Sequence, residues 1–154
     1  MIYEIKPLLG VNNIRLGQTR DEVIQLLGEP ESAEKRSDCY FSAIFQVHYN
    51  REGLVNFIEV YEDNTISALL GGKDIFRTTK SKLRYFIEDN FKGVLDDNDA
   101  EYPCSHTYKR IGVGFWSDMD PSELTKDEVL QYPEGYKMSH YFKSIGIGDK
   151  NYYT

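Results

Sequence analysis

The stretch that decides the fold is residues 14–30, which read IRLGQTRDEVIQLLGEP. Thr19 is followed three residues later by Glu22, the capping-box pattern of a helix start. An apolar stripe follows at helical spacing, made of Val23, Leu26 and Leu27. Gly28 supplies a left-handed cap, and Pro30 prevents the helix from resuming. The stretch therefore predicts a helix of about two turns, short enough to depend on packing.

A hairpin is expected after this helix. Residues 45–49 (FQVHY) alternate between apolar and polar side chains, and residues 54–60 (LVNFIEV) form the returning strand. Asn50 and Gly53 bound the turn, and both residue types tolerate the positive φ that a hairpin loop requires. Residues 40–44 are expected to extend the first strand or to form a strand before it.

Together these segments resemble the opening motif of the BamE-like superfamily. That pattern is Ile-x-x-Gly-x-Thr, then Glu-Val, then Leu-Gly-x-Pro, followed by antiparallel strands with a glycine-led return, which residues 53–58 match. The resemblance covers residues 14 to about 60 and implies a fold without any catalytic residue. Lipoproteins of that superfamily carry a signal and an acylated cysteine. The start of this chain, MIYEIKP, has neither feature, so their outer-membrane assembly role is not expected here.

A looser copy of the same unit follows. Residues 79–83 can be aligned with residues 19–23, and Phe86 and Ile87 then fall where the first helix has its leucine pair. Gly93 is expected to end this second helix. Strand signals resume in two segments, residues 107–116 and residues 140–148.

A helix-then-strands unit that repeats after about 60 residues suggests internal duplication. We therefore expect an α+β fold, with helices packed on antiparallel sheet, in two tandem modules at residues 1–65 and 66–154. The alternative is one α+β domain whose helices share common capping chemistry. If the duplication is real, the architecture resembles that of the β-lactamase inhibitory proteins, which join two such modules and bind a target across one sheet face. This resemblance favours an inhibitor without naming its target.

Charge distinguishes the two parts of the chain. Among its 154 residues the net charge is −7, and residues 88–134 alone hold 12 acidic and 4 basic side chains. This acidic sector disfavours nucleic-acid binding and suits a basic partner, although a merely solvated surface remains an alternative. We expect the basic cluster to be a solvated helix face that pairs internally with the acidic loop. It comprises Lys73, Arg77, Lys80, Lys82 and Arg84.

Several classes of chemistry lack their sequence signatures. The apolar runs are too short for a membrane span, and no signal segment is recognised. The two cysteines are expected to be reduced. Together these features predict a soluble cytoplasmic protein. No Walker loop, zinc-ligand spacing or EF-hand pattern is found, so we expect no cofactor and no metal. Cys104 and His106 lie at alternate positions and leave a small thiol enzyme as the least favoured option.

The candidate binding site lies between residues 96 and 120. Aromatic side chains near acidic groups are common anchors of tight protein interfaces, and carboxylates would steer a basic partner. Trp116 is the best anchor candidate, with a core position at a strand end as the alternative. The candidate partner-binding residues are Asp96, Asp97, Asp99, Glu101, Tyr102, Trp116, Asp118 and Asp120.

These features favour a binding protein without enzymatic activity. The first hypothesis is a cytoplasmic bacterial immunity protein that occludes the active site of a basic toxin domain, with a nuclease-type toxin favoured. The second is a non-enzymatic structural adaptor that lends its sheet to a larger assembly. The third is a small enzyme that uses Cys104 with His106.

Overall fold

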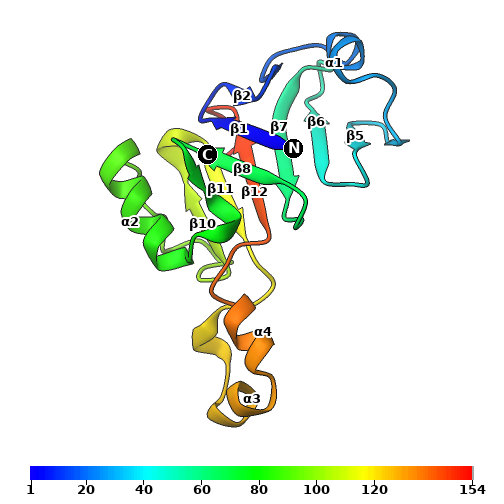
Figure 1. The fold of residues 1–154 in the computed structure, drawn as a ribbon. Helices are drawn as coiled ribbons and strands as arrows, with labels where there is room; N and C mark the ends of the chain where they lie inside the picture. Colours follow the sequence, from blue (N-terminus) through cyan, green and yellow to red (C-terminus); the bar gives the residue numbers. More distant parts are fainter. Residues whose placement is uncertain (154) are drawn as a thin grey trace.

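The computed structural model describes residues 1–153 and shows an α+β fold built on two sheets (Figure 1). The first sheet contains, in spatial order, β3 (Ile14–Arg15), β2 (Gly10–Val11), β1 (Ile2–Lys6), β8 (Ser67–Leu70) and β9 (Lys73–Asp74). The second contains β10 (Ser105–Tyr108), β11 (Val113–Trp116), β12 (Ser144–Gly148), β7 (Val55–Tyr61), β6 (Phe45–Tyr49), β5 (Ser37–Tyr40) and β4 (Ser32–Ala33). All pairs in the second sheet are antiparallel, whereas β1 and β8 pair in parallel.

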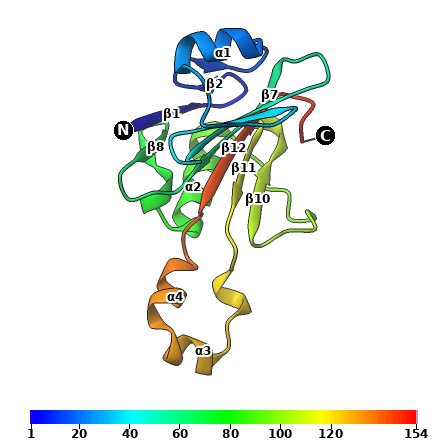
Figure 2. The same cartoon turned by 90° about the vertical axis from the view of Figure 1, so that its right-hand side faces the viewer.

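Four α-helices accompany the sheets. They are α1 (Arg20–Leu27), α2 (Lys80–Phe91), α3 (Lys126–Gln131) and α4 (Pro133–Met138), with 3-10 turns η1 (Ile75–Arg77), η2 (Lys109–Ile111) and η3 (Pro121–Glu123). Residues 117–143, which include α3 and α4, project from the sheets as an arm (Figure 2). No helix within residues 1–153 has the length and apolar character that crossing a membrane requires.

The helix predicted after Thr19 is confirmed as α1. The Thr19 hydroxyl accepts a hydrogen bond from the Glu22 amide, and the Glu22 carboxylate accepts one from the Thr19 amide, both at 3.2 Å. Val23 is the residue of this helix that is fully buried. Gly28 ends the helix with φ +85° and ψ −172°, so the predicted left-handed cap is wrong in ψ although its positive φ does require glycine.

The predicted hairpin is confirmed as β6 and β7. Gly53 has the expected positive φ of +78°. Asn50 contributes through its side chain instead, because its Oδ1 accepts hydrogen bonds from the amides of Glu52 and Leu54, both at 3.0 Å. Residues 40–44 do not extend the first strand: β5 ends at Tyr40, and residues 41–43 form a turn with positive φ.

The second half departs from its predicted boundaries. The helix after Thr79 is confirmed as α2. It ends at Phe91, and the residue that caps it in the left-handed conformation is Lys92 (φ +50°) rather than the predicted Gly93. The strand predicted over residues 107–116 is two strands, β10 and β11, because η2 and Gly112 (φ +64°) turn the chain between them. Of the strand predicted over residues 140–148, only Ser144–Gly148 forms one, as β12.

Strands from both halves of the chain share each sheet. β12 pairs with β7, with Ile145 opposite Val60, and β8 pairs with β1, with Ala68 opposite Tyr3. The buried apolar residues of both halves also form one hydrophobic cluster. The division at residues 65 and 66 therefore falls inside a jointly packed structure, and the duplication stays a prediction.

Candidate functional site

A concave groove on one face of the second sheet brings together three of the residues expected to bind a partner. These three are Asp99, Glu101 and Trp116. The groove has a volume of about 240 Å³. It is lined by Phe57, Glu59, Asp99, Glu101, Ser105, Thr107, Gly114, Phe115, Trp116, Ser144, Gly146, Tyr152 and Tyr153, and we call it the acidic groove.

Strand register explains the floor of the acidic groove. Thr107 lies opposite Gly114, Gly114 opposite Gly146, and Gly146 opposite Glu59, so these four residues form one row across β10, β11, β12 and β7. The glycines make room for aromatic rings. A Cβ at Gly146 would lie 2.3 Å from the ring of Phe57, and one at Gly114 would lie 2.6 Å from a tyrosine hydroxyl. A side chain at either position would therefore displace one of these rings.

Hydroxyl groups of the sheet hold the three carboxylates of the acidic groove. Thr107 donates to Asp99 at 3.2 Å, and Ser105 donates to Glu101 at 3.1 Å. Glu59 accepts from Ser144 at 3.3 Å and from the phenol of Tyr61. Burial and this hydrogen bond raise the pKa of the Tyr61 phenol. Neutral donors orient the carboxylates without cancelling their charge, so the groove presents negative charge.

Aromatic side chains form the walls. Trp116 ends β11 with 41% of its surface exposed, so the alternative that it is a core residue is wrong. Tyr152 stacks on Phe57 with ring centres 4.2 Å apart, and the hydroxyl of Tyr153 donates to the carbonyl of Gly146 at 3.4 Å. Burial raises the pKa of both tyrosine phenols. The groove therefore combines anionic groups with flat apolar surfaces.

Two of the expected carboxylates are instead held by lysines outside the groove. Asp96 pairs with Lys109, and Asp118 pairs with Lys143, each at 2.9 Å. A hydrogen bond from the lysine is the main cause that lowers the pKa of each carboxyl group. Their negative charge is locally matched, which weakens their predicted role in steering a partner.

The other predicted residues are also dispersed. Asp97 is exposed on the loop, and Tyr102 stacks on His106 with ring centres 5.5 Å apart. Asp120 begins η3 and lies 3.7 Å from the ammonium of Lys80. Three of the eight predicted residues therefore line the groove, and the other five lie elsewhere.

Lys80 corrects the expected solvated basic face. Lys80 is only 6% exposed, and its ammonium donates to the Ser117 hydroxyl at 2.6 Å and to the Met119 carbonyl at 2.8 Å. The spacing of Lys80 from the buried Leu83 is compatible with a buried lysine. Its acceptors, however, belong to a segment almost 40 residues later in the chain. A long-range polar contact of this kind leaves no local sequence pattern.

The thiol considered for catalysis lies in an acidic environment. Cys104 donates to the Glu123 carboxylate, with S–O distances of 3.5 and 3.7 Å. Burial and this carboxylate raise the pKa of the thiol, which disfavours the nucleophilic thiolate. Burial lowers the pKa of His106 to about 4.

Residues 1–153 contain no cluster of three or more His, Cys, Asp or Glu side chains able to hold a metal ion. The three groove carboxylates are thus arranged as separate hydrogen-bond acceptors. Such a surface can bind ammonium or guanidinium groups and can stack their carbon chains on aromatic rings. Comparison with family models, curated proteins and solved structures found no match.

Among the groove residues outside the predicted set are one carboxylate, Glu59, and two tyrosines, Tyr152 and Tyr153. Alternation along residues 57–61 places Glu59 on one strand face, but only the β7–β12 register shows which loop and tail share that face. No local pattern shows that Tyr152 and Tyr153 lie against the sheet. Both omissions come from tertiary pairing rather than from local chemistry.

Proposed function

We propose that this chain is a protein-binding inhibitor of the immunity-protein type, which uses the acidic groove to occlude the active site of a basic toxin domain. The observation that carries the proposal is the convergence of Glu59, Asp99 and Glu101 beside the exposed ring of Trp116. A toxin that acts on nucleic acid needs basic side chains around its active site. An acidic, aromatic groove complements those side chains and competes with the nucleic acid.

The test begins with capture of bound proteins from the native cell by the wild-type chain and by the variant Asp99→Asn/Glu101→Gln. The matched control is Asp127→Asn/Glu128→Gln, which removes two charges from α3, outside the groove. The captured protein is then purified, and its association rate is measured at low and high salt. We expect the groove variant to associate tens of fold more slowly at low salt, with the difference reduced at high salt.

Trp116→Ala tests the aromatic wall separately. A buried interface anchor should mainly affect dissociation, at a cost of about 2 kcal/mol or more. The ring is exposed in the free protein, so the melting temperature should change little. Equal rates for the wild type and the groove variant, or failure of the chain to inhibit the captured protein, would contradict the proposed inhibition.

One observation favours a structural adaptor as the second candidate. No residue of α3 or α4 is buried, and the arm exposes Leu130 (80%), Tyr132 (64%) and Met138 (48%). Exposed apolar side chains on a projection are suited to docking into a larger assembly. Docking through them would depend little on salt and would respond to Leu130→Ala rather than to the groove variant.

A further inference from the structure

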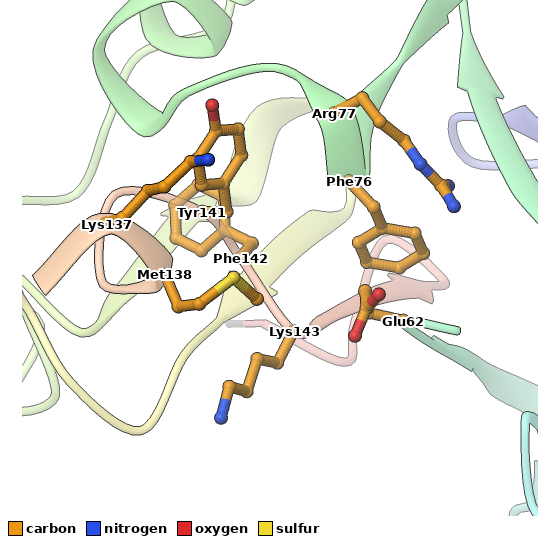
Figure 3. A pocket seen from close by; sticks show the side chains of 8 residues that line it. All are labelled: Glu62, Phe76, Arg77, Lys137, Met138, Tyr141, Phe142 and Lys143. Carbon is orange, nitrogen blue, oxygen red and sulfur yellow. The ribbon is translucent and has the colours of Figure 1, made fainter. Parts of the chain in front are cut away.

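A second cavity, separate from the acidic groove, lies where the arm joins the sheets. It has a volume of about 220 Å³ and lies between η1, the segment after β7 and the end of the arm (Figure 3). Glu62 lies on the side of the sheets, and Lys137 and Met138 lie on α4. The backbone amide of Glu62 donates to the carbonyl of Lys143 at 2.7 Å, which fixes the arm beside the cavity. We call this cavity the joint pocket.

Two opposite charges at the joint pocket are not matched by the protein. Lys143 is paired with Asp118, and Arg77 lies 3.6 Å from Asp74 and donates to the backbone of residues 63 and 66. By contrast, the side chains of Glu62 and Lys137 have neither a hydrogen bond nor an ion pair within residues 1–153. In Figure 3 the Glu62 carboxylate lies beside the Phe76 ring, and the Lys137 ammonium lies across the pocket near Tyr141.

The surface between these charges is apolar. Phe76 and Phe142 are only 5% and 2% exposed, and the flexible side chain of Met138 extends toward the centre of the pocket (Figure 3). Methionine adapts to ligands of different shape because its chain is unbranched and polarizable. The volume of about 220 Å³ lies below the roughly 300–1,000 Å³ of pockets that hold drug-sized ligands. That size suits a small ligand rather than a nucleotide or a peptide.

We propose that the joint pocket binds a free α-amino acid with an apolar side chain. The ammonium of the ligand pairs with Glu62, its carboxylate pairs with Lys137, and its side chain lies against Met138 and Phe76. A zwitterion can form an ion pair with each of these two solvent-accessible charges, whereas a simple anion or cation can pair with only one. For a ligand of this size on an open surface, we expect a dissociation constant on the order of 1 mM.

The ligand test uses L-phenylalanine and L-leucine, with binding followed by NMR chemical-shift changes. Phenylalaninamide lacks the carboxylate, N-acetylphenylalanine lacks the ammonium, and glycine lacks the apolar side chain. We expect saturable shifts at residues of the joint pocket with the two amino acids, and binding at least tenfold weaker with each analogue. Equal binding of either phenylalanine derivative, or no saturation at about ten times the expected constant, would overturn the proposal.

The protein test uses Glu62→Gln and Lys137→Met, which remove one charge each and keep most of the side-chain volume. Neither side chain has a partner to lose, so both variants should melt like the wild type. We expect each to weaken phenylalanine binding at least tenfold. Lys126→Met on α3 and Glu134→Gln on α4 are the matched controls and should bind as the wild type does. Unchanged binding by both pocket variants would show that the charges do not recognise the ligand.

The joint pocket and the acidic groove have no lining residue in common. A failure of amino-acid binding therefore leaves the inhibitor proposal untouched, and loss of partner binding by the groove variants leaves the joint pocket untouched.

Discussion

The two longer helices begin with the same local arrangement and use it differently. Each has a threonine cap followed at once by a cation, Thr19-Arg20 at α1 and Thr79-Lys80 at α2. Both cations reach away from their helix to a carboxylate on a neighbouring segment. Arg20 contacts Asp38 on β5, and Lys80 contacts Asp120 at the base of the arm.

The number of partners separates the two cations. The guanidinium of Arg20 contacts both carboxylate oxygens of Asp38 and donates to the backbone carbonyls of residues 34, 35 and 37. It also lies over the ring of Tyr49, 5.0 Å from the ring centre. The ammonium of Lys80 acts as a point charge with fewer contacts. Thus one arrangement anchors a helix to the sheet, and the other fastens the arm to a helix.

The largest effect should follow from removing the carboxylate at the α1 end. Asp38 is fully buried and accepts from both Arg20 and the phenol of Tyr49, the latter at 2.9 Å. Asp38→Ala leaves the partly exposed guanidinium without its counter-ion and the buried Tyr49 phenol without its acceptor, so we expect a loss of about 3 kcal/mol in the free energy of unfolding. Urea denaturation measures this loss. The double variant Arg20→Met/Asp38→Leu should recover part of it, and a loss below about 1 kcal/mol would mean that the pair does not anchor α1.

Lowering the pH should reduce the stability of the fold through His106, a β10 residue whose pKa responds to the charge of Lys80 at the start of α2. Burial first, and the charge of Lys80 second, lower the pKa of this histidine from 6.5 to about 4. The unfolded chain therefore binds a proton between these values that the folded chain excludes, so stability falls as the pH drops from 6.5 toward 4. The upper limit is roughly 3 kcal/mol. Unfolding measured across this range should show a reduced pH slope in His106→Phe, and an unchanged slope would contradict this assignment.

Removing the cation at the α2 end should cost less than removing Asp38. Lys80→Met keeps the packing against the Phe142 ring, which lies 5.3 Å from the ammonium. It removes the donor to the Ser117 hydroxyl and the Met119 carbonyl, and the cation beside Asp120. We expect a loss of about 1–3 kcal/mol. Hydrogen exchange should increase more in the arm than in α1. The control is Lys82→Met, at an exposed position two residues later on α2, which should change neither the free energy of unfolding nor the exchange rates.

Local sequence patterns predicted the first half of the fold better than the second. The capping box at Thr19 and the turn between β6 and β7 are settled by neighbouring residues, and both were found. The β1–β8 pair was missed because a parallel contact between residues 2 and 67 depends on packing rather than on a local pattern. The turn at Gly112 was missed because strand-forming side chains flank it on both sides.

The candidate site was predicted in part for a related reason. Charge density pointed to residues 96–120, and it found Asp99 and Glu101. It could not distinguish them from Asp96 and Asp118, which lysines neutralise, because ion pairing depends on which residues meet in the fold. Glu59 escaped notice since its strand lies 40 residues earlier in the chain.

The smallest effect we expect is a difference in stability loss when each of the two capping threonines is replaced by alanine. Thr19 completes a reciprocal capping box, whereas the side chain of Thr79 makes no capping hydrogen bond, and Lys82 stands where the first helix has Glu22. Thr19→Ala should therefore cost about 0.5–2 kcal/mol, and Thr79→Ala should cost only a few tenths. Thermal unfolding of both variants measures the difference directly. The variant Lys82→Glu offers the second cap its missing partner, so it should make Thr79→Ala more costly than it is in the wild-type background. Equal losses for Thr19→Ala and Thr79→Ala would show that the two helix starts are energetically alike despite their different hydrogen bonds.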